Sequence, residues 1–274
     1  PSVAGAVIAV VAGGDTGSTF GVGIVFYVIA ALYGVSALSN LLLHNAGLPM
    51  AGKEHGVRKE VVDGLAYIWR HPVLRALFGA TFLTMMFGTP VQFLMPAFNQ
   101  DQLGGGPDGL GMLMGSMGVG AITGSLILAR MGEVRRKGRW LLAIALAWGL
   151  ATWVFAGAEV MRSALPLVAV VGLFSSMYMS MNMSLIQLTV DDAMRGRVMS
   201  VMMMTFGLMP IGVVPISFLA EAFGIGIALA VCGAILGGVT LLMAVFAGPL
   251  RRIDTGYEGL PGGVESGVPP EVER

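Results

Sequence analysis

The chain has 274 residues, of which 55% are hydrophobic and 12% are charged, and its mean hydropathy is +0.81. This apolar content exceeds the roughly 45 to 50% of an ordinary soluble domain and is typical of a protein that lies in a lipid bilayer. Sixteen basic and sixteen acidic residues give a net charge of zero, which removes any general electrostatic argument for nucleic acid as a partner.

Apolar stretches long enough to cross a membrane follow one another along the chain. A crossing needs about 20 apolar residues and must satisfy its own backbone hydrogen bonds, which favours helices over the short alternating strands of a barrel. We therefore predict an all-α fold, a polytopic membrane helix bundle. One truncated span is expected at 1–14, and complete spans are expected at 20–43, 73–98, 109–129, 140–158, 164–189, 198–220 and 225–248.

The basic residues of the loops agree with this count of spans. Alternate loops hold fifteen of the sixteen Lys and Arg residues: five around 44–75, five in 130–139, two in 190–197 and three after 248. By the positive-inside rule these loops are cytoplasmic. We therefore expect a multi-pass protein of the cell membrane, plasma or inner, with a cytoplasmic C-terminus.

Polar residues on the span from 73 fall on one helical face. At about 100° per residue, a sector of roughly 80° contains Thr81, Thr84, Gly88, Gln92 and Asn99. Pro90 and Pro96 each remove a backbone donor and are expected to bend the helix beside this stripe. The stripe either lines a substrate cavity or holds neighbouring helices together.

Glycines on the span from 109 fall on two faces. Gly111, Gly115 and Gly118 share one face, and Gly120 and Gly124 lie nearly opposite. Small residues let helix backbones approach closely in lipid. We expect both faces to pack on neighbouring helices.

Methionine alternates with small or polar residues in SSMYMSMNMSLIQL, residues 175–188. Such alternation has the period of a strand, and four thioethers suggest a soft metal. The stretch lies within the predicted span 164–189, however, so we expect a helix. On a helix Met177 pairs with Met181 and Met179 pairs with Met183, about 200° apart, and the four thioethers cannot bind one ion together.

Two polar stripes lie between these methionines. We expect the stripe with Ser175, Tyr178 and Asn182 to line a substrate cavity opposite Gln92, and the serine face, with Ser176, to pack on a neighbouring helix. The twenty methionines of the chain either give an adaptable surface for varied ligands or simply fill the core.

Motifs for enzymes, metals and cofactors are absent from the sequence. His44, His55 and His71 lack metal-ligand spacing, Cys232 is the single cysteine, and neither a phosphate-binding loop nor a serine-hydrolase motif occurs. We expect no enzyme activity, no metal and no cofactor. Within the predicted spans, no charged residue lies far from an end. The charged residue that comes nearest to the membrane interior is Glu221, at an outer boundary.

Four quoted stretches resemble the second half of a major facilitator superfamily transporter, in the bacterial branch of enterobactin-exporter-like efflux proteins. They are GLAYIWRHPVLRALF with the following LMPAF, GLGMLMGSMGVGAITGSLILARM, and DDAMRGRVMSVMMMTFGLMPIG. The resemblance covers the chain to about Arg252. It implies a fragment with the major facilitator fold that runs from about the fifth to the twelfth transmembrane helix.

On this resemblance the chain divides into four regions. Residues 1–43 correspond to the last two helices of an N-terminal half, the first of them truncated, and 73–248 form the C-terminal six-helix bundle. Between them, 44–72 is a cytoplasmic linker, and 249–274, rich in Gly, Pro and Glu, is an expected disordered tail. An amphipathic helix on the membrane surface is predicted in the linker from the helical spacing of Val57, Val61, Leu65 and Ile68.

The resemblance also implies a function. It implies a secondary active transporter that works by alternating access, with proton-coupled efflux of small, partly apolar molecules that are drug-like or siderophore-like. The expected partners are the lipid bilayer, a small-molecule substrate and protons, and the full-length protein is expected to be a monomer. The ionisable coupling residue is expected in the N-terminal half. The alternative is a membrane sensor or scaffold with the same fold and no transport.

A short charged loop contains Asp191, Asp192, Arg195 and Arg197. The resemblance implies a gate there, made of ion pairs that form in only one access state. The alternative is a solvated turn whose charges contribute little.

Overall fold

The computed structural model describes residues 19–42, 57–132 and 137–246. The predicted span 1–14, the first part of the predicted linker and the predicted tail 249–274 lie outside the described residues. The described elements are helices, and η1 is a π-helix. Their bounds are α2 (Thr19–Leu42), α3 (Val57–Arg70), α4 (Pro72–Phe87), α5 (Pro90–Ala97), η1 (Phe98–Gln102), α6 (Pro107–Arg130), α7 (Lys137–Ala156), α8 (Met161–Thr189), α9 (Asp192–Phe206), α10 (Met209–Phe223) and α11 (Ile225–Phe246).

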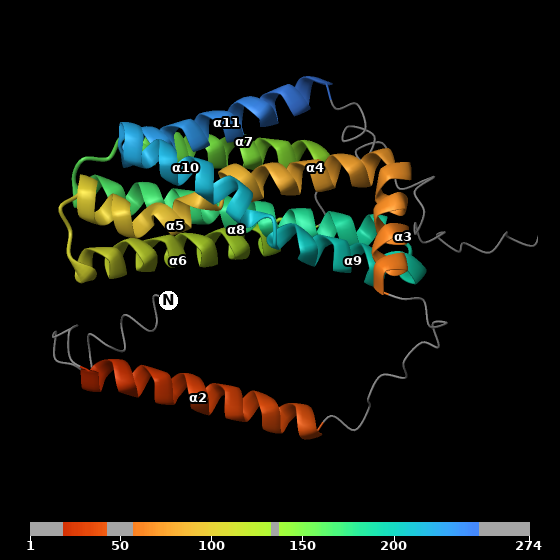
Figure 1. The fold of residues 1–274 in the computed structure, drawn as a ribbon, viewed down its shortest axis with the longest axis horizontal. Coiled ribbons are helices and arrows are strands. Elements are labelled where there is room, and N and C mark those ends of the chain that lie inside the picture. The colour runs from red at the N-terminus through yellow and green to blue at the C-terminus, as the bar shows by residue number, and fades with distance from the viewer. Residues whose placement is uncertain (1–18, 43–56, 133–136, 247–274) are drawn as a thin grey trace, which may run out of the picture.

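Six stretches among the described residues are long and apolar enough to cross a membrane. They are Pro72–Gln102, Pro107–Arg130, Lys137–Ala156, Met161–Thr189, Asp192–Phe223 and Ile225–Ala244. The all-α prediction is confirmed, and the six spans predicted from 73 onward match these stretches. α2 contains a shorter apolar stretch, Ala30–Ser39, and Figure 1 shows α2 apart from the bundle that the other helices form.

The first of the six spans is broken between α4 and α5. Pro90 has no backbone N–H, so the helix cannot continue its hydrogen-bond ladder through this residue. The turn before it widens, because Thr84 O accepts from Gly88 N at 2.8 Å and also from Thr89 N, five residues on, at 3.1 Å. Space for this turn requires a glycine: a Cβ on Gly88 would lie 2.5 Å from the Trp148 ring.

A second break divides the predicted continuous span 198–220 into α9 and α10. Gly207 N donates to Met204 O at 3.0 Å and Leu208 N donates to Thr205 O at 3.1 Å, which are bonds of the tighter 3₁₀ type. Pro210 then begins α10 in the first helical turn, where its missing N–H costs nothing. The apolar pattern of the sequence predicts one continuous span here and no break.

Glycine contacts bring α6 and α8 close together. A Cβ on Gly120 would collide with Ala169 O, and a Cβ on Gly124 would collide with Leu173 O. From the other side, a Cβ on Gly172 would collide with Met117 O. The Gly120 and Gly124 face of α6 thus packs on a neighbouring helix. The face predicted from Gly111, Gly115 and Gly118 is not closely packed along its whole length. A Cβ on Gly111 would have no atom within 4 Å.

Helix α3 crosses one end of the bundle (Figure 1). Its inner side rests on α9: a Cβ on Gly64 would lie 2.9 Å from Arg197 O, and Ile68 is 3% exposed. Of the predicted apolar face, Leu65 points outward and is 52% exposed. The helix therefore divides its apolar side chains between the bundle and its outer surface.

Candidate functional site

A cavity of about 550 Å³ opens among seven of the described helices. This volume lies within the range of about 300 to 1,000 Å³ that is typical of small-molecule sites. Helices α4 to α6 and α8 to α10 contribute most of its wall, and α7 adds Trp148. The lining residues are Met85, Thr89, Gln92, Met95, Met114, Met117, Gly118, Ala121, Trp148, Ser175, Ser176, Met179, Phe206 and Met209.

Both helix breaks border this cavity. Thr89 and Gln92 come from the break before α5 and its first turn, and Phe206 and Met209 flank the break between α9 and α10. Transporters commonly build their sites at interrupted helices, since non-helical backbone is tolerated at membrane depth only where it is buried or lines a cavity. Pro90 and Pro210, which begin the helices after the two breaks, thus help to bring side chains to one site.

Methionine dominates the cavity wall, with six of the fourteen lining residues. The thioether side chain is flexible and polarisable, so a methionine wall adapts its shape to different apolar ligands. The four alternating methionines of residues 177–183 do not all have the same role. Met179 lines the cavity, whereas Met177 and Met181 are each 5% exposed and belong to the core.

Gln92 is the polar lining residue that is most available to a ligand. Its side chain is exposed and makes no hydrogen bond within the described part of the chain. By contrast, Ser175 Oγ donates to Gly172 O at 3.0 Å, and Ser176 Oγ lies 2.8 Å from Ser125 Oγ on α6. The Gln92 amide therefore offers both donors and an acceptor to a molecule in the cavity.

The remaining predicted cavity residues lie elsewhere. Thr81, Thr84, Tyr178 and Asn182 are each 1% exposed and are absent from the cavity wall. Asn182 Nδ2 donates to Thr81 Oγ1 at 2.7 Å, and the Tyr178 ring packs on Trp148 with centroids 5.8 Å apart. Of the predicted stripe with Ser175, Tyr178 and Asn182, only Ser175 lines the cavity, and Ser176 of the serine face both lines it and contacts Ser125 of α6.

Asn99 also has a role away from the cavity. It lies in η1, where its Nδ2 donates to Gly105 O and Gly106 O, both at 2.9 Å. These bonds hold the turn that leads into α6. Of the predicted stripe along α4, α5 and η1, the structure therefore brings only Gln92 to the cavity wall, together with the unpredicted Thr89.

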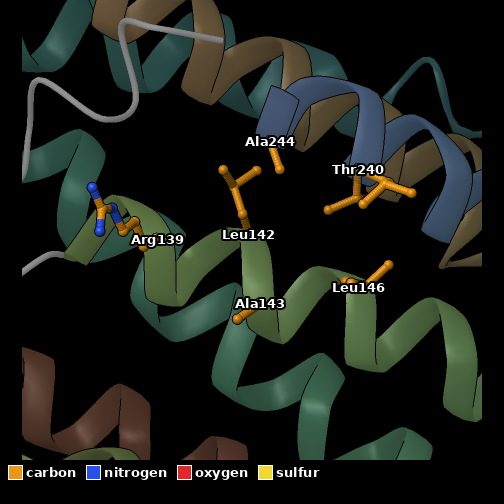
Figure 2. Close-up of a pocket in the computed structure, with 7 residues that line it drawn as sticks. Arg139, Leu142, Ala143, Leu146, Thr240 and Ala244 are labelled. Atoms are coloured by element: carbon orange, nitrogen blue, oxygen red, sulfur yellow. The ribbon is translucent and has the colours of Figure 1, made fainter. Parts of the chain in front are cut away.

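A second hollow of about 450 Å³ lies between α7 and α11, at the other side of α7 (Figure 2). Its lining is almost entirely aliphatic, with Arg139 at one end: Arg139, Leu142, Ala143, Leu146, Thr240, Leu241 and Ala244. This hollow, which we call the α7–α11 crevice, shares no lining residue with the methionine-lined cavity.

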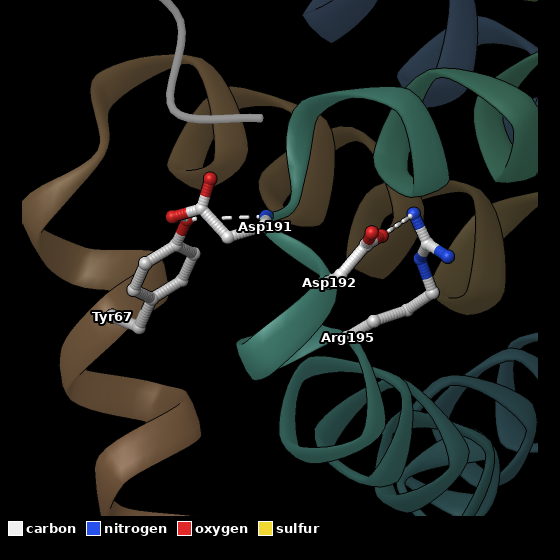
Figure 3. Close-up of polar contacts among 4 residues, drawn as sticks. All are labelled: Tyr67, Asp191, Asp192 and Arg195. Atoms are coloured by element: carbon white, nitrogen blue, oxygen red, sulfur yellow. Dashed lines mark hydrogen bonds and ion pairs between the residues drawn. The ribbon is translucent and has the colours of Figure 1, made fainter. Parts of the chain in front are cut away.

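The predicted gating residues separate into two groups (Figure 3). Asp192 and Arg195 pair within the first turn of α9, at 2.5 Å, with side chains 88% and 50% exposed. Asp191 and Arg197 instead contact α3. Tyr67 Oη donates to Asp191 Oδ2 at 2.9 Å, and Arg197 Nη1 lies 3.7 Å from Asp63 Oδ2.

Tyr67 and Asp63 are the residues that sequence reasoning missed at this loop. Both lie on the inner side of α3, and a helical wheel of α3 places them within one turn of the buried Gly64 and Ile68. Burial raises the pKa of the Tyr67 hydroxyl, and its hydrogen bond to Asp191 raises the pKa further. The tyrosine therefore stays protonated and donates to the carboxylate across the neutral range.

These features define a class of protein. Six stretches long and apolar enough to cross a membrane, two of them broken beside one cavity, form the helix bundle of a polytopic membrane protein. The family model of the Major Facilitator Superfamily matches residues 2–213, and the chain belongs to this family of transporters. It is a multi-pass membrane protein, as predicted.

Two curated relatives match most of the chain. One is the multidrug efflux pump Tap of Mycolicibacterium fortuitum, which is 28% identical over 80% of this chain and 54% of its own length. The other is the staphyloferrin A transporter of Staphylococcus aureus, which is 26% identical over 82% of this chain and 54% of its own length. The chain thus spans about half the length of these relatives. No solved structure matches it.

Proposed function

We propose that this chain contains the C-terminal, substrate-binding half of a secondary active transporter that exports small, partly apolar molecules. The methionine-lined cavity carries this proposal: it is apolar, it is of small-ligand size, and it offers one available amide, that of Gln92. A wall of this kind binds apolar molecules of different shapes and orients them through one polar group.

The names of the relatives agree with this substrate class. One is named for multidrug efflux and the other for a siderophore, so the matched region occurs in transporters of drug-like and siderophore-like molecules. We propose efflux as the direction of transport, in keeping with the named pump.

We propose proton coupling as the driving force, with the coupling group outside this cavity. None of the fourteen lining residues is ionisable between pH 5 and 8. A group that binds and releases the proton must be ionisable, so it belongs to another part of the full-length transporter.

We propose alternating access as the mechanism, with α3 and the start of α9 as part of the cytoplasmic gate. The Tyr67 to Asp191 hydrogen bond and the Asp63 to Arg197 pair join the linker helix to the loop between α8 and α9. Contacts of this kind favour the access state in which they form. The proposed setting is the inner membrane, with the basic loops and the C-terminus in the cytoplasm and the full-length protein a monomer.

The test is transport by the full-length protein in proteoliposomes under an imposed pH gradient, with ethidium as the probe. Gln92→Ala should lower the apparent affinity for ethidium, whereas Gln100→Ala, an exposed glutamine of η1 outside the cavity, should leave it unchanged. Ethidium binding without gradient-driven movement would favour the alternative, a sensor or scaffold with this fold.

A further inference from the structure

The α7–α11 crevice is a wedge between two helices. At its closed end the backbones touch: a Cβ on Gly149 would lie 2.6 Å from Gly237 N, and a Cβ on Gly233 would lie 2.5 Å from Trp153 N. Toward the α3 end of the bundle, Leu142 and Leu146 replace glycine on α7 and hold the helices apart. Glycines of both helices therefore close one end of the crevice, and leucines of α7 line the open end.

The walls of the crevice suit hydrocarbon. Leucine and alanine side chains form most of the surface (Figure 2). The one hydroxyl on the wall, Thr240 Oγ1, donates to Leu236 O of its own helix at 2.6 Å, so it needs no partner from a ligand. Along α7 the crevice extends from Arg139 to Leu146, about 10 Å at 1.5 Å per residue.

The mouth of the crevice lies at the level of lipid head groups. Trp140, beside Arg139, is 44% exposed, and tryptophan at the end of a membrane span marks the boundary between hydrocarbon and head groups. Arg139 is exposed at this boundary, and the same end of the bundle holds Arg130, the last residue of α6, and Lys137, the first residue of α7. A basic mouth thus opens into an apolar slot.

We propose that the α7–α11 crevice binds an anionic phospholipid, with one acyl chain between the helices and the phosphate at Arg139. Basic sites between membrane helices recognise anionic head groups, and each nearby basic residue contributes through its charge. The positive charge selects the head group, and the aliphatic wedge holds the chain. This site is separate from the methionine-lined cavity and does not depend on the proposed transport.

Native mass spectrometry of the full-length protein in detergent tests the head-group contact. The probes are phosphatidylglycerol and phosphatidylcholine with the same acyl chains, and we expect the anionic lipid to bind about five-fold more tightly. Arg139→Gln should reduce this preference by about five-fold, and Arg139→Lys should keep it. Arg162→Gln, a matched loss of charge at the opposite end of the bundle, should have no effect.

Occlusion of the slot tests the position of the acyl chain. Ala143→Trp fills the crevice from α7, and Leu241→Trp fills it from α11. If one of these variants misfolds, the other still tests the proposal. Either should lower phosphatidylglycerol binding at least as much as Arg139→Gln, whereas Ile122→Trp, at an exposed position of α6 that does not line the crevice, should not. Equal binding of the two lipids, or equal effects of Arg139→Gln and Arg162→Gln, would overturn the proposal.

Discussion

Asn182 and Thr81 form a buried hydrogen bond between two membrane helices. Asn182 Nδ2 of α8 donates to Thr81 Oγ1 of α4 at 2.7 Å, and Thr81 Oγ1 in turn donates to Leu77 O at 2.9 Å. Both side chains are 1% exposed. The pair joins two helices that contribute to the cavity, so it positions the wall without contacting the substrate.

The first prediction concerns this pair. Thr81→Val removes the acceptor and leaves the Asn182 amide buried without it, which should lower the free energy of unfolding by about 0.5 to 2 kcal/mol. Thermal unfolding in detergent measures the loss. Thr189→Val is the control, because Thr189 is equally buried and bonds only to Leu185 O of its own helix. A double-mutant cycle with Asn182→Ala that gives no coupling energy would refute the pair.

The second prediction concerns the contact between α6 and α8. Gly120→Ala places a methyl group against Ala169 O, a backbone atom that cannot rotate away, so the helices must separate. We expect a loss of about 1 to 3 kcal/mol, seen as a lower unfolding temperature. Gly111→Ala on the same helix meets no atom within 4 Å and should be neutral or stabilising, since alanine favours helix. Equal effects of the two changes would contradict this packing.

The third prediction concerns the size of the cavity. Ala121 is a small residue in the wall, and Ala121→Phe should exclude large substrates more strongly than small ones. Uptake assays in vesicles with substrates of graded size measure this. Ile122→Phe is the control, because Ile122 is 64% exposed and lies outside the cavity wall. A uniform loss of transport at all sizes would show that Ala121→Phe disturbs folding and does not fill the cavity.

The fourth prediction concerns the contact between α3 and the loop before α9. Tyr67→Phe removes the hydrogen bond to Asp191, worth on the order of 1 kcal/mol, and should shift the access equilibrium about five-fold toward a cytoplasmically open state. The labelling rate of Met179→Cys by a membrane-impermeant maleimide from the cytoplasmic side measures the shift, in a Cys232→Ala background. Arg195→Gln breaks only the exposed pair with Asp192 and should leave the rate unchanged.

The fifth prediction concerns the pH dependence of the same contact. The pKa of Tyr67 is raised in the folded protein, so its stabilising contribution is fully present below the unfolded value of about 10 and is lost as pH rises through the folded pKa. The labelling rate should therefore stay constant from about pH 7 to 9 once corrected for thiol ionisation. The tyrosinate absorbance of wild type minus that of Tyr67→Phe should show a midpoint above 10. A midpoint at or below 10 would contradict the buried contact.

Sequence reasoning recovered the helices because the membrane imposes a simple rule. Each span must be apolar and must satisfy its own backbone, and charge must collect in alternate loops, so length and composition suffice to place the six spans from 73 onward. The bend at Pro90 was equally predictable, because a proline removes a donor wherever it stands. The break at Gly207 was not, since glycine permits a turn without requiring one.

The candidate site was only partly predictable for a different reason. A helical wheel gives the angle of each residue about its own axis, and this angle correctly separated Met179 from Met177 and separated Tyr178 from Ser176. It does not give the rotation of that axis against its neighbours. Within one polar stripe, Tyr178 and Asn182 therefore lie in buried helix contacts while Ser175 borders the cavity, and Ser176 of the serine face borders it as well.

The sequence by itself thus determined what is local or one-dimensional: the spans, the alternation of charge and the family resemblance. The tertiary structure decided which faces meet. Tyr67 and Asp191 are 124 positions apart, and Thr81 and Asn182 are 101 apart, so no periodicity connects them. Glycine contacts set the rotation and spacing of the helices, as Gly120 does against Ala169. That close packing, and not hydropathy, placed Gln92 and the methionines around one cavity.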